Sequence, residues 1–445
     1  MGVETYEKQL DSFDPKERRD ALEVLIEMTE QGKIKLPEPG YFVNMHCHTF
    51  YSFNGAGYSP VKIAWKARKM GLAAAGSVDF DTLEALEEFR EAGTKLGLKT
   101  VSGFETRVFV PEFAKRVINS PGEPGIAYHM GVGFASSDLT GESSKLLQGL
   151  KTTAQNRNMN LLEKVNSYLS PIELDYENDV MVLSPSGNPT ERHICSAYMT
   201  KAELHFDTHQ ELAEFWSEKL GVSADELNLP NSPQLANAIR KKTMKRGGVG
   251  YVQPDPDSFP NMADVNEFIL ASGGIPVFTW LDGTSEGEQD IEELLEIAMA
   301  TGVEAVNIIP DRNFTPGEWL DNEKCRKLYE FVGLANKLDL PILVGTEMNS
   351  PGQKFVDDFG SNELASLVPS FYDGAMTIYG HCVLIHTIGI GYTGGWADHH
   401  FDNRADKNKF FLEVGKLADP ATYEKKLKNF DFSAEPEKIL KKLKK

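Results

Sequence analysis

The sequence predicts a globular α/β protein with a mainly parallel sheet that is interrupted by a helical insertion. Short apolar segments of strand length alternate with amphipathic helical segments over residues 41–134, and again over residues 266–390. Between them, over residues 135–265, the strand signals fade and polar helical sequence dominates. The length of 445 residues is compatible with about three domains or with one barrel that carries an insertion.

An N-terminal segment over residues 1–40, which we expect to be helical, precedes the first alternating stretch. Residues 14–32 predict an amphipathic helix with Ala21, Leu22 and Leu25 on one face. The segment YFVNMHCH then predicts a short buried strand with two histidines at its carboxyl end. Helices are expected over about residues 60–70 and in DTLEALEEFREAGTKLG, and strands in LAAAGSVDF, LKTVSGFETRVFV and AYHMGVGF.

The insertion and the second part follow the same logic. SSKLLQGLKTTAQNRNMNLLEKVNSYL is typical of the polar helices that we expect over residues 135–265. Alternation resumes with IPVFTW, IEELLEIAMATG, VEAVNIIP, KCRKLYEFVGLANKLDL and PILVGTEMN. Residues 391–445 form a C-terminal extension that ends in the basic helix EKILKKLKK, which we expect to be solvated.

Composition narrows the classes of function. The formal net charge is −20 and the pI is about 5.0, which argues against a protein that binds long nucleic acid or an anionic membrane. A small phosphorylated ligand remains compatible, since a few cations in one pocket can hold it. The four cysteines are scattered, the N-terminus is too charged for a signal peptide, and no apolar window approaches 18 residues. We therefore expect a cytoplasmic protein, and the oligomeric state is not predicted.

The strongest local signal is His46-Cys47-His48. Residues i and i+2 of a strand face the same side, so both imidazoles can hold one ion. The alternative is a pair of histidines that the fold happens to bury. Cys47 would point the other way, and we expect it in the core.

Further polar residues follow the ends of predicted strands: Asp79, Asp81, Glu105, His129, Glu347 and Asn349. In a parallel α/β barrel these ends meet at one rim, so residues that are distant in sequence can share a cavity. Carboxylates combined with imidazoles suit Zn, Mn or Fe. For Asp81 we favour a helix N-cap, because Glu84 stands at the capping-box position.

The order of these motifs resembles the PHP (polymerase and histidinol phosphatase) family. It is carried by His46 and His48, by the D-x-D-T segment of Asp79, by Glu105 in SGFETR, and by the segment around His129. ERHICSAYM, GGIPVFTWLDG and GLANKLDLPILVGTEMNSPGQ resemble later motifs of the family. The nearest likeness is to its nucleoside-phosphate phosphoesterase and short-RNA exonuclease branch, which carries a helical insertion.

The resemblance implies a distorted seven-stranded (β/α) barrel with metals at one rim and hydrolysis of phosphate esters. Carried over, the metal ligands would be His46, His48, Glu105 and Glu347, with Glu105 and His129 holding a second ion. Asp79, Arg192 and His193 would be catalytic. A small phosphorylated substrate would be bound by residues drawn from Arg107, Lys245, Arg246, Arg312 and Asn349.

The sequence also departs from the family's pattern. Trp280, Phe80 and Asn349 occupy positions where the family has histidines. We therefore expect one or two divalent ions per chain, with His193 or His381 replacing a lost ligand or with fewer ions bound. Hydrolysis of an amide or another bond on the same barrel, and a non-catalytic metal-binding relic, remain as alternatives.

Overall fold

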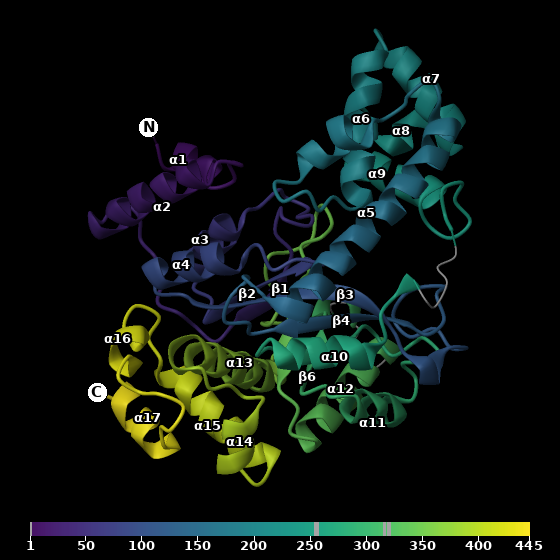
Figure 1. Ribbon diagram of the computed structural model, residues 1–445. Coiled ribbons are helices and arrows are strands. Elements are labelled where there is room, and N and C mark those ends of the chain that lie inside the picture. Colours follow the sequence, from purple (N-terminus) through teal and green to yellow (C-terminus); the bar gives the residue numbers. More distant parts are fainter. Residues whose placement is uncertain (1, 253–257, 315–316, 318–321) are drawn as a thin grey trace.

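Seven strands of the computed structural model form one sheet in the order β1 to β7, and the sheet curls into a nearly closed barrel (Figure 1). The structure describes residues 2–252, 258–314, 317 and 322–445. The strands are β1 (Val43–Cys47), β2 (Ala74–Phe80), β3 (Lys99–Phe109), β4 (Ile126–Val132), β5 (Ile275–Trp280), β6 (Ala305–Ile308) and β7 (Ile342–Val344). A parallel bridge between Cys47 and Glu347 connects the two edges. The predicted seven-stranded α/β barrel is confirmed.

Strand β4 differs from the parallel arrangement that the alternation predicts, because it runs antiparallel to both β3 and β5. Only residues 110–125 connect β3 to β4, and their regular structure is the single 3₁₀ turn η1 (Pro111–Phe113). A parallel neighbour needs a crossover of a dozen or more residues, usually a helix, whereas a reversing loop gives an antiparallel pair. As a result, β4 has its N-terminal end at the rim where the other strands have their carboxyl ends.

Helices cover the outside of the barrel. They are α3 (Pro60–Lys69), α4 (Leu86–Leu96), α10 (Met262–Ala271), α11 (Ile291–Ala300), α12 (Glu323–Lys337) and α13 (Val368–Ile388). Two N-terminal helices, α1 (Val3–Gln9) and α2 (Pro15–Glu30), precede them. Helix α2 starts where the sequence predicts, because the Asp14 side chain accepts from the Lys16 amide and Pro15 occupies the first helical position.

Asp81 is not the N-cap that its position before a helical segment predicts. Helix α4 begins only at Leu86, and the Asp81 backbone has a φ of +54°. Its carboxylate instead accepts a hydrogen bond of 2.6 Å from the Thr106 hydroxyl of β3. The polar side chain is thereby held at the rim of the barrel.

Of the α-helices that the structure describes between β4 and β5, all except α10 project above the barrel (Figure 1). They are α5 (Gly141–Leu169), α6 (Glu191–His205), α7 (His209–Leu220), α8 (Ala224–Leu227) and α9 (Pro233–Thr243). Their buried side chains form a separate hydrophobic core that runs from Leu161 to Met244 and includes Trp216 and Tyr198. The first half of α5 instead packs Leu147 and Leu150 against the core of the barrel.

The C-terminal helices are α14 (Gly395–His400), α15 (Arg404–Leu417), α16 (Tyr423–Leu427) and α17 (Pro436–Leu443). Helix α17 is less solvated than its basic sequence predicts, because Ile439 and Leu443 are buried in the main core. Its lysines occupy the opposite face, as in other amphipathic helices. In the part of the chain that the structure describes, no helix is both long enough and apolar enough to cross a lipid bilayer.

Candidate metal centre

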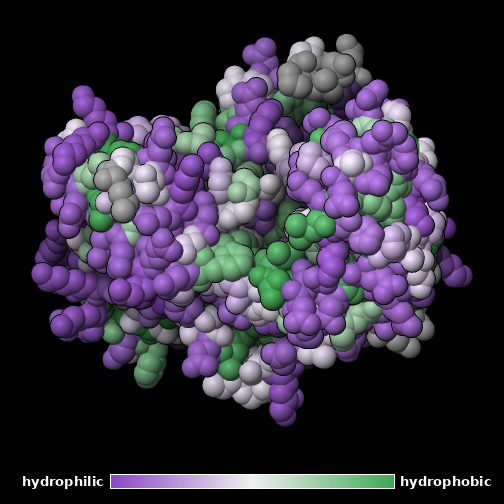
Figure 2. All heavy atoms as spheres, turned by 90° about the horizontal axis from the view of Figure 1, so that it is seen from above, coloured by the Kyte–Doolittle hydropathy of each residue, from purple (hydrophilic) through white to green (hydrophobic). Residues whose placement is uncertain are grey.

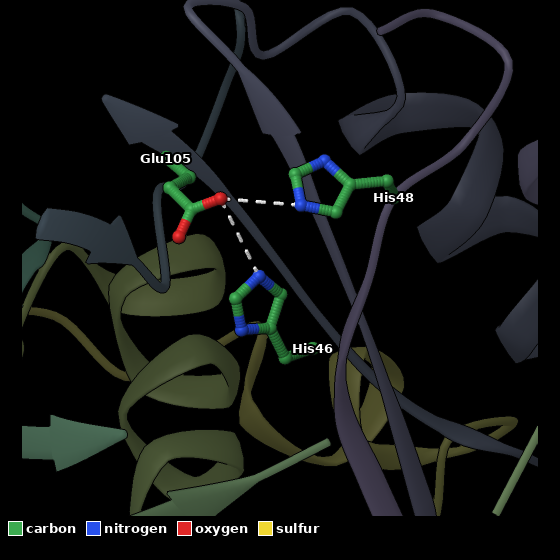
Figure 3. A group of neighbouring side chains, drawn as sticks. All are labelled: His46, His48 and Glu105. Atoms are coloured by element: carbon green, nitrogen blue, oxygen red, sulfur yellow. Dashed lines mark ion pairs between the residues drawn. The ribbon is translucent and has the colours of Figure 1, made fainter. Parts of the chain in front are cut away.

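His46, His48 and Glu105 meet inside the barrel at the rim (Figure 3). His46 stands near the end of β1, His48 follows that strand, and Glu105 comes from β3. The Glu105 Oε2 atom lies 3.2 Å from His48 Nε2 and 3.8 Å from His46 Nε2. The three candidate ligand atoms lie within 4.8 Å of one another, and all three residues are buried.

The atoms that face each other in this cluster have no hydrogen-bond partner. His46 Nε2, His48 Nε2 and Glu105 Oε2 are all buried and unpaired. Because a buried polar atom without a partner costs free energy, such atoms call for an explanation. Two imidazole nitrogens and one carboxylate oxygen are a common ligand set for a divalent transition metal, with room left for water or substrate. These residues therefore fit one metal ion.

The electrostatics of the cluster keep the carboxylate ionised. Burial by itself would raise the pKa of Glu105, but the two imidazoles more than offset this and hold that pKa at about 2. Burial likewise opposes protonation of His46, yet the Glu105 carboxylate raises the net pKa of its imidazole. A carboxylate that remains charged in a buried site is suited to a cation.

The other nitrogen of His48 belongs to a chain of hydrogen bonds that ends on Asp79. His48 Nδ1 lies 3.1 Å from the Ser52 hydroxyl, which donates to Asp79 at 2.6 Å. Asp79 also accepts from the Thr49 amide and hydroxyl, each at 2.7 Å. Both carboxylate oxygens are thus engaged behind His48. The predicted direct catalytic role of Asp79 does not fit this placement, and the residue positions the His48 ring instead.

His46 has an analogous partner that the sequence did not point to. Its Nδ1 atom lies 3.1 Å from the Asn307 side-chain nitrogen, while the Asn307 Oδ1 atom is buried and unpaired. Rotating the amide by half a turn exchanges the two atoms and offers an acceptor to a protonated Nδ1. Asn307 therefore orients His46 with Nε2 toward Glu105. The sequence feature that could have indicated Asn307 is its position as a polar residue inside the apolar segment VEAVNIIP.

His129 does not join the cluster, so its prediction as a metal ligand is wrong. On β4, Met130 lies opposite Glu105 and His129 lies opposite Thr106. Successive residues of a strand face opposite sides, so His129 points out of the barrel. There its Nε2 atom lies 2.5 Å from Asn266 Oδ1 on α10, and burial lowers its pKa to about 4.

Trp280 also faces outward, since its ring stacks on Phe331 of α12 at a centroid distance of 4.4 Å. The inward neighbour at the end of β5 is Thr279, which lies beside Asn307. His381 cannot replace a ligand, because its two nitrogens contact the Tyr392 amide and the Gly133 carbonyl. Phe80 does point inward, with its ring 4.4 Å from that of His48, and it makes that side of the centre apolar.

Glu347 borders the cluster but is engaged elsewhere. Its Oε2 atom accepts a hydrogen bond of 2.7 Å from Arg312. Its backbone carbonyl accepts from the His48 amide at 2.7 Å, and its amide donates to the His46 carbonyl at 2.8 Å. Glu347 is thus fixed next to both histidines, while its carboxylate is not among the atoms that converge on Glu105.

In the insertion, His193 and Arg192 have structural partners. His193 belongs to a capping box in which its Nδ1 atom accepts from the Thr190 amide at 3.0 Å. This use of Nδ1 does not favour the predicted catalytic role of His193. Arg192 donates to the Ser350 hydroxyl at 2.8 Å and to the Asn237 side chain at 2.7 Å. It therefore ties the insertion to the loop after β7, next to the half-buried Asn349.

The predicted substrate-binding cations Arg107, Lys245 and Arg246 all have polar partners in the structure. Arg107 pairs with Glu123 at 2.8 Å, Lys245 pairs with Glu191 at 2.9 Å, and Arg246 reaches the Gly122 carbonyl. Arg157 and Arg240 belong to the same set, because their charges act on Arg107 and Lys245. From above, this face is mainly hydrophilic, with apolar side chains gathered in the hollow between two lobes (Figure 2).

These observations agree with the resemblance on two counts: a seven-stranded barrel, and a His-x-His pair and a glutamate that meet at its rim. The chain resembles the PHP family. No family model matches the chain. A segment of 71 residues is 32% identical to part of the error-prone DNA polymerase of Cutibacterium acnes, and it covers 16% of this chain and 6% of the polymerase.

Two solved structures are similar to this chain. One, from Bifidobacterium adolescentis, is provisionally described as a metal-dependent phosphoesterase, with a TM-score of 0.46, 18% identity, and coverage of 76% of this chain and 98% of that one. The other is an amidohydrolase from Chromobacterium violaceum with bound sulfate and no metal, with a TM-score of 0.44, 16% identity, and coverage of 71% and 92%.

Proposed function

We propose that this protein is a metal-dependent hydrolase that cleaves a phosphate ester of a small molecule with one divalent ion, which would be Zn, Mn or Fe. The observation that carries the proposal is the set of three buried, unpaired atoms, His46 Nε2, His48 Nε2 and Glu105 Oε2, within 4.8 Å of one another. When bound at such a site, a divalent ion lowers the pKa of water toward neutrality and polarises a phosphoryl oxygen.

The residues of the chain prepare the centre for that chemistry. Ser52 and Asn307 hold the Nδ1 atoms of His48 and His46, so that both Nε2 atoms face Glu105. Such outer hydrogen bonds fix the orientation of metal-binding imidazoles. The Phe80 ring covers one side of His48 and excludes water there. A drier site strengthens the attraction between charged groups.

An anionic substrate needs local cations on a protein whose net charge is −20. The rim supplies Arg107 and Arg312, and the insertion supplies Arg192 and Lys245. Hydrogen bonds between guanidinium groups and phosphate oxygens are charge-assisted, and they are stronger than neutral hydrogen bonds. We infer that the substrate lies between the insertion and the rim, with its ester directed at His46, His48 and Glu105.

A second candidate is hydrolysis of an amide on the same barrel. It is favoured by the single cluster of two histidines and one glutamate, because a catalytic ion held by two histidines and a glutamate is also the arrangement of zinc peptidases. The two candidates share the metal. They differ in the substrate, because a phosphate ester is an anion that the cations can bind and an amide is neutral.

The test begins with metal-depleted protein that is reloaded separately with Zn, Mn or Fe. Each form is assayed on phosphomonoesters, phosphodiesters and amides of small molecules. We expect hydrolysis of phosphate esters that depends on the added ion and is lost in His48→Ala. His209→Ala, which changes an exposed histidine of α7, is the matched control and should retain full activity. Amide hydrolysis alone would support the second candidate, and a metal-loaded protein inert on every substrate would favour a metal-binding relic.

A further inference from the structure

The ion pair between Arg312 and Glu347 lies next to the metal centre. Arg312 ends the 3₁₀ turn η5 (Pro310–Arg312) after β6, and Glu347 follows β7. Their Nη2 and Oε2 atoms are 2.7 Å apart. The Glu347 side chain is 8% exposed and that of Arg312 is 46% exposed. The pair therefore has a buried carboxylate and a guanidinium that reaches solvent.

The charges of the centre also act on the Arg312 guanidinium. Burial lowers the pKa of its guanidinium, but Glu347, Tyr128 and Glu105 more than offset this and raise the pKa overall. Glu347 acts in turn on His46. The charges of Glu347 and Glu105 therefore both act on this guanidinium.

We propose that Arg312 binds the anionic group of the substrate beside the metal, and that Glu347 holds Arg312 in place instead of binding a second ion. This inference rests on the proposed hydrolase function, and it names Arg312 as the residue that recognises the negative charge of the substrate. It also predicts one ion per chain, because the Glu347 carboxylate beside the cluster is already paired with Arg312.

Charge at the centre supports this division of roles. Two carboxylates, one guanidinium and one divalent ion leave a single net positive charge, which attracts a phosphate. Without Arg312 the same centre is neutral. A guanidinium has five N–H donors, and in the described part of the chain the contact of Nη2 with Glu347 is the only hydrogen bond of the Arg312 guanidinium. The remaining donors suit two oxygens of one phosphate.

Glu347 is suited to positioning because its backbone leaves it little freedom. Its φ is +61°, and its amide and carbonyl are both bound to β1. Gln353 contacts the same Oε2 atom at 3.5 Å. The Glu347 carboxylate is therefore held toward Arg312 by the closure of the barrel.

The experiment measures metal content and the binding of inorganic phosphate to the zinc-loaded full-length chain, without any turnover. Metal content is obtained by elemental analysis, zinc affinity by competition with a chelator, and phosphate affinity by calorimetry. We expect one zinc per chain in the wild type. In Arg312→Gln, phosphate affinity should fall by about ten- to hundredfold, the range for loss of a hydrogen bond to a charged group. Zinc affinity should remain within about twofold, far below the effect of losing even an outer partner of a ligand.

Two further variants and one control complete the test. Glu347→Gln should keep one zinc with nearly unchanged affinity, while phosphate binds more weakly because the loss of the anchor of Arg312 outweighs the removal of one negative charge. The double variant Arg312→Gln/Glu347→Gln should show the same metal content and bind phosphate more weakly than the wild type, because the guanidinium is absent. Arg116→Gln removes a cation that pairs with Glu293 away from the centre, and it should behave as wild type. Circular dichroism and thermal unfolding verify that each variant is folded.

A second zinc in the wild type that is lost in Glu347→Gln would overturn the inference. Wild-type phosphate affinity in folded Arg312→Gln would also overturn it. If both assignments hold but no ester is cleaved, Arg312 remains an anion-binding residue and the proposed phosphoesterase function is the part that fails.

Discussion

The two halves of the barrel rim use their polar residues differently. On strands β1 to β3, His46, His48 and Glu105 converge with buried, unpaired atoms. On strands β4 to β7, His129 and Trp280 turn outward, and Glu347 is neutralised by Arg312. One half therefore presents free ligand atoms, and the other presents an ion pair and inert side chains.

The difference shows how strand direction and charge pairing decide which residues become ligands. The direction of a strand and the parity of a residue along it fix which side chains enter the barrel, and on β4 those are Tyr128 and Met130. A carboxylate near the centre, such as that of Glu347, can still form an ion pair with a nearby cation instead of binding a metal. The predictions below test whether all metal binding lies on the β1 to β3 side.

The largest effect is expected for His48→Ala. It removes one of three ligand atoms and leaves Glu105 with a single imidazole partner. Zinc affinity should fall by more than the roughly ten- to hundredfold that loss of an outer hydrogen-bond partner costs. Chelator competition measures the affinity, and an ester assay should lose activity in parallel. Zinc affinity equal to that of the wild type would place the metal elsewhere.

Trp280→His tests the outward half directly, because it restores the residue type that the sequence resemblance leads one to expect there. The new imidazole would lie against Phe331 of α12 and not in the barrel. Loss of the stacked ring should lower the free energy of unfolding by about 3 kcal/mol, as for other large-to-small core changes. Metal content should remain at one per chain. A second bound ion would show that β5 presents this position to the inside.

Asp79→Asn should weaken zinc binding by about tenfold, the lower end of the range for an outer partner of a ligand. The amide accepts fewer hydrogen bonds than the carboxylate that now holds Thr49 and Ser52, so Ser52 and the His48 ring gain freedom. Asp20→Asn on the exposed face of α2 is the control. Equal zinc affinity in the two variants would contradict a positioning role for Asp79.

The smallest effect is expected at His129, and it concerns stability instead of metal. Its folded pKa of about 4 is below the unfolded value near 6.5, so its contribution is present above pH 6.5 and is lost as the pH falls toward 4. At pH 5.5 this loss is about 1.4 kcal/mol. His129→Gln should remove that part of the pH dependence in denaturant unfolding and leave zinc affinity unchanged. His209→Gln is the control and should alter neither the pH dependence nor the zinc affinity. Weaker zinc binding in His129→Gln would instead indicate that His129 is a metal ligand.

The part of the site that the sequence predicted is the part that depends on local geometry. The alternation of a strand places His46 and His48 together, and Glu105 lies in a predicted strand, two strands away. The parity of His129 and the reversed direction of β4 depend on the whole sheet, so a strand-end pattern could not reveal them. The partners Asn307 and Arg312 come from β6 and the turn after it, far from the histidines in sequence. Ion pairing across such distances leaves no local signal.

The fold shows the same division. Alternating strands and helices indicated the barrel, and the loss of that alternation indicated helices above it. The antiparallel β4 depended on the length and content of the loop before it, which carries no helix. Closure of the barrel relies on Glu347 and Met348, two consecutive non-glycine residues with positive φ that sequence preferences disfavour.

The separate core of the insertion has an evolutionary consequence. Every buried side chain of that core comes from the stretch between Leu161 and Met244, and the three ligand candidates come from residues 46 to 105. Substitutions in the core of the insertion can therefore accumulate without changing the three candidate ligands. Paralogues of this chain should diverge fastest in α6 to α9, and their metal requirement should be the trait they continue to share.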